Sequence, residues 1–473
     1  MTAAVQALSD FIYGRILIVL LLGAGVYFTF RLRFIQFRHF GVMFRVLAGS
    51  RKAGREHISS FQALATSLAA RVGTGNLAGV AIAITMGGPG AVFWMWIVAL
   101  VGMATTFIES TLAQLYKVRG PGGGYRGGPA YYMHLGLGRR WMGVLFALAL
   151  MTAFGLFFNS VQANTIAAAF QESFSVPAAW TGVGLVALAG AVIFGGLKAV
   201  ARFAEIVVPF MAGGYLLLAL YVVFTHIERV PGVLLLILES AFGLREAVAG
   251  GVAYSVQQAM INGVRRGLFS NEAGMGSAPN AAASADPQPP HPASQGYVQM
   301  LGVFVDTLVI CTCTGSIILL SGVYDPGSAT TGIELTQQAL SAEVGRWGGL
   351  FVAAAVFLFA FTSIVANYSY AESNLLFLSR NPKLLQGFRV GVLGLVLFGS
   401  LAQLPLVWAL ADVAMSLMAL LNLTAILWLS RTALWAARDF DRQWDEGRKP
   451  QFRATATPSG GDLPAGIWES GAR

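Results

Sequence analysis

Charged residues are scarce in this chain. Only 11% of its 473 residues are charged, whereas 56% are hydrophobic. Soluble domains contain about 25% charged and about 45–50% apolar residues, so a soluble protein of this composition could not cover its surface with polar groups. The chain is also too long to be a single-span anchor. We therefore predict an all-α polytopic membrane protein surrounded by the lipid bilayer.

Cysteine and histidine are scarce as well. Cys311 and Cys313 are the two cysteines, and at that spacing on a helix they point to different faces and cannot bridge each other. Two cysteines are too few for a zinc site, and the five histidines are scattered without ligand spacing. The N-terminus lacks the basic segment and the small-residue cleavage site of a signal peptide, so we predict no cleaved leader.

Apolar runs of about 20 residues, broken by glycine, proline or charge, predict eleven membrane spans. Their approximate bounds are 14–31, 61–86, 91–116, 141–170, 178–197, 205–225, 246–286, 295–321, 348–378, 385–403 and 405–430. The region 246–286 is the least regular of them.

Basic residues gather on alternate connections between these spans. They are frequent in 32–60, 117–140 and the segment after 431, and rare on the opposite side. The positive-inside rule then predicts a bacterial inner-membrane protein with a periplasmic N-terminus and a cytoplasmic C-terminus. The net charge of +9 follows from this topology, so no nucleic-acid binding is predicted. Arg265 and Arg266 fall in the outer half of a span, against the rule.

Three segments outside the spans have a distinctive composition. The stretch "VRGPGGGYRGGPAYY", 118–132, is rich in glycine, but it lacks the Lys-Ser/Thr pair of a phosphate-binding loop and is predicted to form a structured turn. The stretch "SADPQPPHPAS", 284–294, cannot be helical through its length because of its prolines. The polar segment from about 440 is predicted to be disordered.

The second span contains "ARVGTGNLAGVA", which is unusual for a helix inside a membrane. Glycine costs about 1 kcal/mol per helix position relative to alanine, and irregular backbone at this depth survives only where protein or a polar cavity surrounds it. The stretch indicates either an unwound helix that lines a site or a small-residue face, Gly75 and Gly79, that packs against another helix. The polar Thr74 and Asn76 favour the site.

A second stretch of this kind, "LFSNEAGMGSAPN" at 268–280, lies five spans downstream. Interrupted segments at matching positions in both halves are typical of secondary transporters built from inverted repeats. We predict one extra N-terminal span with a basic connection (1–60), a first five-helix repeat (61–226), a second (227–435) and a polar cytoplasmic tail (436–473). The second break is expected at 271–276, with 246–260 as an external helix; a break at Gly250–Gly251 is the rival.

Four separated motifs resemble those of the alanine-or-glycine:cation symporter family. They are "ARVGTGNLAGVA", "YRGGPAYYM", "RRGLFSNEAGMGSAP" and "FAFTSIVANYSYAESN", and the resemblance covers roughly residues 55–430. The family is similar in fold to leucine-transporter-type amino-acid:sodium symporters. The resemblance therefore implies a 5+5 inverted-repeat bundle that imports a small neutral amino acid together with Na⁺ by alternating access.

The resemblance also implies positions for the two transported species. An unwound helix leaves N–H groups free for a carboxylate and C=O groups free for a cation, and oxygen ligands suit Na⁺. The implied Na⁺ ligands are the carbonyls of Ala69 and Val72 and the hydroxyls of Thr362 and Ser363. The implied substrate-binding residues are Thr74, Gly75, Asn76, Gln162, Gly274, Met275, Gly276, Ser363 and Asn367.

Several of these residues have a simpler interpretation. Hydroxyls such as those of Thr362 and Ser363 often bond to the preceding helical turn, and Gln162 could serve only to form an interhelical hydrogen bond. Asn367 stands where family members that resemble strict alanine and glycine carriers have tryptophan. Its smaller side chain suggests room for a larger or polar substrate, serine or glutamine, unless Met275 or Phe158 fills the gap.

The spans also carry buried ionisable residues, which in a membrane are expected to have partners. They are Arg71, Glu109, Glu272, Asp306 and Glu372. Because a cation beside Na⁺ is unfavourable, we expect Arg71 to point away from the site and to pair with Glu272 or Asp306.

Other functions have less support in the sequence. A channel requires a continuous polar lining, a pump a nucleotide site, and an enzyme a catalytic set, and none of these patterns is found. An amino-acid sensor and a proton-coupled carrier of the same fold stay open as alternatives. We expect a monomer with no resident cofactor, the Na⁺ being transported cargo.

Overall fold

The computed structural model describes residues 2–50, 58–120, 124–195, 197–244, 252–458 and 461–468. These residues form helices almost throughout, and the strands among them are four pieces of two residues. The predicted all-α membrane class is therefore confirmed. Helices satisfy every backbone group within one segment, as a bilayer demands.

The first half of the chain contains the following elements. They are α1 (Thr2–Ile12), η1 (Tyr13–Leu17), α2 (Ile18–Arg31), α3 (Ile35–Arg38), α4 (Phe40–Ala48), β1 (Ile58–Ser59), α5 (Ser60–Arg71), η2 (Gly75–Gly79), α6 (Val80–Gly87), α7 (Gly90–Leu115), β2 (Val118–Arg119), β3 (Tyr125–Arg126), α8 (Pro129–Tyr131), η3 (Tyr132–Gly136), α9 (Arg140–Leu150), η4 (Met151–Phe158), α10 (Asn159–Phe174), α11 (Ala178–Ile193) and α12 (Leu197–Thr225).

The second half contains α13 (Val230–Ala241), α14 (Val252–Asn271), α15 (Ala278–Ser284), β4 (Ala285–Asp286), α16 (Pro292–Val303), η6 (Phe304–Cys311), α17 (Thr312–Leu320), α18 (Gly332–Val344), α19 (Arg346–Leu378), α20 (Pro382–Leu401), α21 (Leu404–Trp428) and α22 (Ser430–Asp445). The η segments are π-helical turns that continue the neighbouring helices.

Eight helices among the described residues are long and apolar enough to cross a membrane. They are Val5–Arg31, Gly90–Leu115, Arg140–Phe174, Ala204–Thr225, Pro292–Leu320, Arg346–Leu378, Pro382–Leu401 and Leu404–Trp428. The bent pair Ser60–Arg71 and Gly75–Gly87 raises the number to nine. A polytopic protein is thus confirmed, while the count of eleven stays a prediction. The first candidate span begins at Val5 rather than at 14. Of the polar residues added by this extension, Asp10 forms an ion pair with Arg265 of α14.

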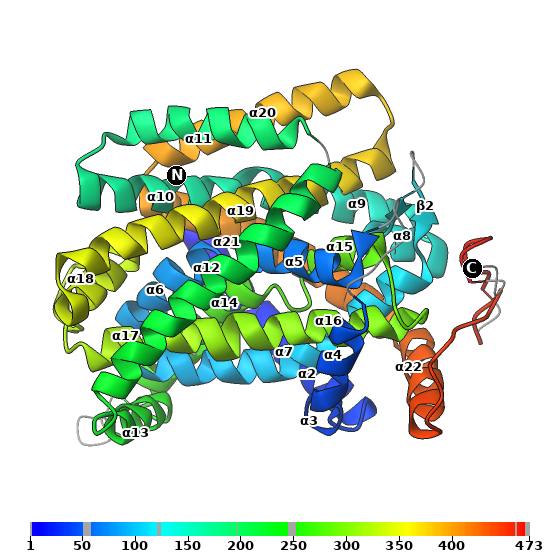
Figure 1. Cartoon of the computed structure of the whole chain (residues 1–473), viewed down its shortest axis with the longest axis horizontal. Helices are drawn as coiled ribbons and strands as arrows, with labels where there is room; N and C mark the ends of the chain where they lie inside the picture. The colour runs from blue at the N-terminus through cyan, green and yellow to red at the C-terminus, as the bar shows by residue number, and fades with distance from the viewer. Residues whose placement is uncertain are drawn as a thin grey trace.

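The helices form layers around the interrupted segments. Figure 1 shows α10, α11 and α20 on one side of the molecule and α2, α7 and α16 on the other, with α5, α6 and α14 between them. Helix α14 packs closely on α7, where a Cβ atom at Gly263 would lie 2.4 Å from the Ala91 carbonyl oxygen. The two interrupted segments are therefore enclosed by protein on both sides.

The helix predicted at 246–260 is not a separate element in its described part. Residues 252–260 are the first half of α14, which continues to Asn271 without interruption. The break follows at Glu272–Ser277, close to the expected 271–276. The rival break at Gly250–Gly251 lies outside the described residues. Sequence periodicity missed the long helix because three of the four residues at 255–258, "SVQQ", are polar and interrupt its apolar face.

Short strands hold the connections at one end of the bundle. Strand β1, just before α5, pairs in parallel with β4, just after α15. This pairing joins the two interrupted segments at their ends. Strands β2 and β3 pair in antiparallel orientation, so the segment 118–132 is structured as predicted in its described part; residues 121–123 lie outside that part.

The expected disorder of the segment after 440 is wrong for its described part. Helix α22 continues to Asp445, and beyond it Phe452, Leu463 and Trp468 are buried. The Phe452 amide donates to the Pro290 carbonyl at 3.0 Å, and the Trp468 indole N–H donates to the Gln114 carbonyl at 3.3 Å. Three apolar anchors fix this segment although its average composition is polar.

Candidate functional site

The first interrupted segment unwinds between α5 and η2. The axes of Ser60–Arg71 and Gly75–Gly87 differ by 50°, which confirms the break predicted at "GTGN". The backbone N–H of Gly73 has lost its helical acceptor and donates instead to the side-chain Oδ1 of Asn76, at 2.9 Å. The backbone N–H of Asn76 donates to the Gly73 carbonyl at 3.2 Å. The side chain of Asn76 therefore stabilises the unwound turn.

Two side chains from other helices meet this unwound turn. Gln162, on α10, accepts from the Thr74 amide at 3.0 Å and from the Thr74 hydroxyl at 2.6 Å through the same Oε1 atom. Ser363, on α19, donates to the Ala69 carbonyl at 2.8 Å. A Cβ atom at Gly73 would lie 2.4 Å from Ser363 Oγ and 2.9 Å from Gln162 Oε1. The three helices thus converge on Gly73, and these polar side chains are buried.

Of the other two residues predicted on α19, Thr362 shares an acceptor with Ser363, because Ser363 also donates to the Phe359 carbonyl, at 3.0 Å. Thr362 donates to the Phe359 carbonyl of its own helix at 2.8 Å, which is the back-bonding that its residue type favours. Asn367 donates to Asn159 Oδ1 at 3.2 Å. Because Asn367 follows Ser363 by four residues and Asn159 precedes Gln162 by three, this contact lies one turn from the Ser363 and Gln162 side chains.

A buried carboxylate lies beside the unwound turn, and the sequence analysis gave it no role at the site. Asp306 accepts from Asn76 Nδ2 at 2.8 Å through Oδ1, and from the hydroxyls of Ser270 and Thr307 at 2.8 Å each through Oδ2. The sequence feature that could have pointed to Asp306 as a site residue is its position as an aspartate in an apolar span. Three donors on one side chain show that the carboxylate is held in place.

The second interrupted segment turns away from the first. Gly274 and Gly276 have positive φ, 82° and 84°, a conformation that glycine adopts without strain. A Cβ atom at Gly274 would contact Leu423, and one at Gly276 would contact Asn422, both on α21. The buried Met275 lies between these two glycines and forms a backbone hydrogen bond to Glu272. Neither glycine has the first segment among its nearest neighbours.

The last turn of α14 approaches the first segment instead. A Cβ atom at Gly75 would lie 3.0 Å from Ser270 Cα and 3.1 Å from Phe269 Cδ1. Phe269 stacks on Phe158 with ring centroids 4.3 Å apart. The sequence analysis missed both residues because it assigned the second half's contribution to the glycines rather than to the helix before them.

The expected ion pair of Arg71 is absent from the described part of the chain. Its Nη1 atom donates to the Gln299 carbonyl at 3.2 Å, where Gly302 leaves room for the guanidinium. The prediction fails because both carboxylates have other partners. Asp306 is bound as described above, and Glu272 accepts from the Ser277 hydroxyl at 2.5 Å.

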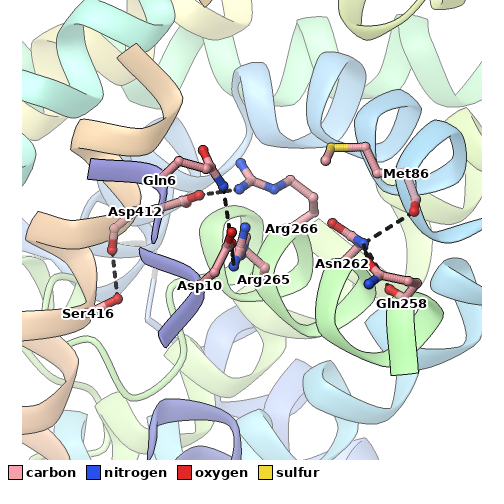
Figure 2. A network of polar contacts seen from close by, with 9 residues as sticks. All are labelled: Gln6, Asp10, Met86, Gln258, Asn262, Arg265, Arg266, Asp412 and Ser416. Carbon is pink, nitrogen blue, oxygen red and sulfur yellow. Dashed lines mark hydrogen bonds and ion pairs between the residues drawn. The ribbon is translucent and has the colours of Figure 1, made fainter. Parts of the chain in front are cut away.

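Paired charges lie at the end of the bundle where α6 finishes and α21 begins. Figure 2 shows Arg265 beside Asp10 and Arg266 beside Asp412. The N–O distances in these two ion pairs are 2.7 Å and 2.5 Å. These pairs explain why two arginines occur in a half-span where the charge rule predicts few. They border a cavity of about 310 Å³, which Trp408 also lines.

Aromatic rings lie between this cavity and the unwound turn. Trp408 contacts Phe269, with ring centroids 4.5 Å apart, and Phe269 in turn contacts Phe158 and the backbone at Gly75. The Arg266 guanidinium lies over the Trp408 ring, 4.4 Å from its centroid. The turn is therefore covered on this side by one ion pair and a stack of rings.

Comparison with known proteins adds an independent finding. Residues 1–454 match the sodium:alanine symporter family. The chain is 50% identical to the "Probable sodium/glutamine symporter GlnT" of Bacillus subtilis (strain 168), over 94% of this chain and 91% of that protein. It is 49% identical to the amino-acid carrier protein AlsT of the same organism, over 98% of this chain and 96% of that protein. It is 37% identical to the sodium/proton-dependent alanine carrier protein of Bacillus sp. (strain PS3), over 89% of this chain and 96% of that protein.

Proposed function

Because the chain belongs to the sodium:alanine symporter family, we propose that it imports a small neutral amino acid together with Na⁺ by alternating access. The observation that carries this proposal is the convergence of Gln162 and Ser363 on the unwound turn at Gly73. Backbone groups released from helical hydrogen bonds in the middle of a membrane, and bonded instead to neutral polar side chains, suit a zwitterion and a monovalent cation.

The substrate carboxylate would bind the amides of Thr74, Gly75 and Asn76. In this structure Gln162 Oε1 accepts hydrogen bonds from the backbone N–H and the hydroxyl of Thr74. A carboxylate carries more charge than an amide oxygen and makes stronger hydrogen bonds, so it would displace Gln162 from them. The freed Gln162 side chain would then bind the substrate amine through its own carbonyl oxygen.

Na⁺ would bind one turn below, among the carbonyls of Ala69 and Val72 and the hydroxyls of Thr362 and Ser363. The 2.8 Å hydrogen bond from Ser363 to the Ala69 carbonyl supports this position, because it already brings two oxygen atoms together. Thr362 bonds to its own helix and would have to rotate to reach the ion. We therefore propose that Ser363 contributes more to the Na⁺ affinity than Thr362 does.

From the second repeat, Phe269 and Ser270 in the last turn of α14 would line the pocket directly. Gly274, Met275 and Gly276 would contribute to it less directly. The contacts at Gly75 support this assignment. Positive φ at the two glycines would shape the break, and Met275 between them would act on the pocket through the position of α14. Asn367 would leave room for serine or glutamine, in keeping with the naming of the relative GlnT as a probable sodium/glutamine symporter.

Proton coupling is a second candidate, favoured by the buried Asp306 carboxylate next to Asn76. A carboxylate in an apolar interior can exchange a proton when its hydrogen-bond partners move. The two couplings give different results when a sodium gradient and a proton gradient are imposed separately.

The topology of eleven spans also remains a proposal. Nine spans follow from length and composition if the bent pair is one span. The short apolar helix α11 and the broken pair α14 and α15 would complete the set. In a cysteine-free background, reagent added outside should label a cysteine introduced at position 3 and miss one at 460. The reverse pattern would contradict the orientation and the repeat assignment together.

The experiment that tests the function is uptake of radiolabelled alanine into proteoliposomes. We expect accumulation with an imposed Na⁺ gradient and none when K⁺ replaces Na⁺. Unlabelled glycine, serine and glutamine should compete, whereas leucine should compete less. Uptake that follows an imposed proton gradient without Na⁺ would favour the second candidate, and binding without uptake would contradict both.

A further inference from the structure

A basic cavity of about 400 Å³ lies where α19 ends and α9 begins, on the face with the β2–β3 hairpin. Its basic lining residues are Arg119, Arg126, His134, Arg140 and Arg380. They come from four segments that are distant in sequence: the hairpin, η3, the start of α9 and the residues after α19. The fold, rather than one basic stretch, brings these charges together.

The positive charge of this cavity has no acidic counterpart. Its lining contains no aspartate or glutamate, and within the described ranges none of its four arginines forms an ion pair. Arg126 Nη1 is buried without a hydrogen-bond partner. This differs from the opposite end of the bundle, where Arg265 and Arg266 each have a carboxylate. The cavity therefore suits an anion with several acceptor oxygens.

Apolar side chains complete the lining. Leu376, Phe377 and Leu378, from the last turn of α19, form one side of the cavity. Leu135 also lines it and is 39% exposed, and the neighbouring Trp141 is 57% exposed. Both α19 and the helix beginning at α9 are long enough to cross a membrane. The cavity thus lies at the depth where head groups meet acyl chains, and exposed tryptophan is typical of that depth.

We propose that this cavity binds the head group of an anionic phospholipid. The arginines would contact the phosphodiester, and the acyl chains would lie along the apolar ends of α19 and α9. Charge clusters between membrane helices at the cytoplasmic face bind such lipids. A free phosphate would use the arginines but not the apolar side. The proposal requires that these two helices span the bilayer with the β2–β3 end on the cytoplasmic side, and it is independent of the transported substrate.

The test measures binding of radiolabelled phosphatidylglycerol to the full-length protein in detergent. Phosphatidylcholine serves as the neutral lipid, and inorganic phosphate is the soluble competitor. The Arg140→Gln/Arg380→Gln variant removes two exposed lining charges. The Arg431→Gln/Arg438→Gln variant, on the exposed face of α22, removes the same charge away from the cavity.

We expect saturable binding of phosphatidylglycerol and at least tenfold weaker binding of phosphatidylcholine. The cavity variant should lose about thirtyfold in affinity for phosphatidylglycerol, since each basic residue near a membrane surface contributes about fivefold and two are removed. The control variant should bind like the wild type. Equal losses in both variants, equal binding of the neutral lipid, or displacement by millimolar phosphate with no preference for the lipid would overturn the proposal.

Discussion

A methyl group at Gly73 should damage the site without unfolding the protein. Gly73 is not among the glycines with positive φ, so its backbone can accept alanine and the effect is steric. The added Cβ atom would lie 2.4 Å from Ser363 Oγ and within 3.3 Å of both terminal atoms of Gln162. These two side chains must move aside, and both belong to the proposed binding site.

The cost of such overpacking is about 1–3 kcal/mol. If this cost falls on the bound state, the affinity for alanine and Na⁺ should drop about fivefold to 150-fold, because about 1.4 kcal/mol corresponds to a factor of ten. The same substitution at Gly79 gives a matched control on the same segment. Its nearest neighbour would be a Trp408 ring atom at 3.6 Å, an ordinary contact, so Gly79→Ala should bind like the wild type.

The assay combines equilibrium binding of alanine at several Na⁺ concentrations with the thermal unfolding midpoint of each purified variant. We expect Gly73→Ala to bind both solutes more weakly while its unfolding midpoint stays within a few degrees of the wild type. Unchanged binding in Gly73→Ala, or an equal loss in Gly79→Ala, would refute the assignment of the site to this turn.

Three further predictions concern other residues. Ser363→Ala should lower the Na⁺ affinity at least tenfold, whereas Thr362→Ala should cost less, because both hydroxyls bond to Phe359 but that of Ser363 also reaches the Ala69 carbonyl; sodium titration of alanine uptake separates them, and the opposite order would be inconsistent with the proposed ligands. Asn367→Trp should spare alanine uptake and remove competition by glutamine and serine; a wild type that already rejects both would rule this out. Burial lowers the pKa of His291 below 6.5, and the hydrogen bond between the His291 ring and the Asp439 carboxylate lowers the pKa of Asp439. The unfolded state therefore binds more protons, and the unfolding midpoint should fall as the pH drops below about 6.5, less steeply in His291→Gln; an equally steep fall in that variant would speak against the assignment.

The sequence predicted the first break because its glycines and polar residues are costly in a lipid-facing helix. The contacts of Gln162 and Ser363 with this break could be expected only through the family resemblance. Neither lies near it in sequence, and a hydrophobic pattern does not identify partners on distant helices. Asn367 was predicted to follow Ser363 along the same helix face, and its contact with Asn159 lies one turn further on.

The remaining errors have a common physical origin. Partners for Arg71 were chosen by charge, but Asp306 and Glu272 are hydrogen-bonded to neutral donors. Composition predicted disorder after 440, yet isolated apolar residues such as Phe452 and Trp468 bury themselves against the bundle. Composition averages over a segment, whereas packing depends on where single side chains lie.

The most direct test of the central claim is the entry of radioactive sodium into proteoliposomes. It is measured with and without external alanine, at zero membrane potential, for the wild type and for Gly73→Ala. The proposed coupling predicts that alanine stimulates sodium entry in the wild type and that the stimulation is largely lost in the variant. Sodium entry that is independent of alanine in the wild type would contradict the coupling of the two solutes.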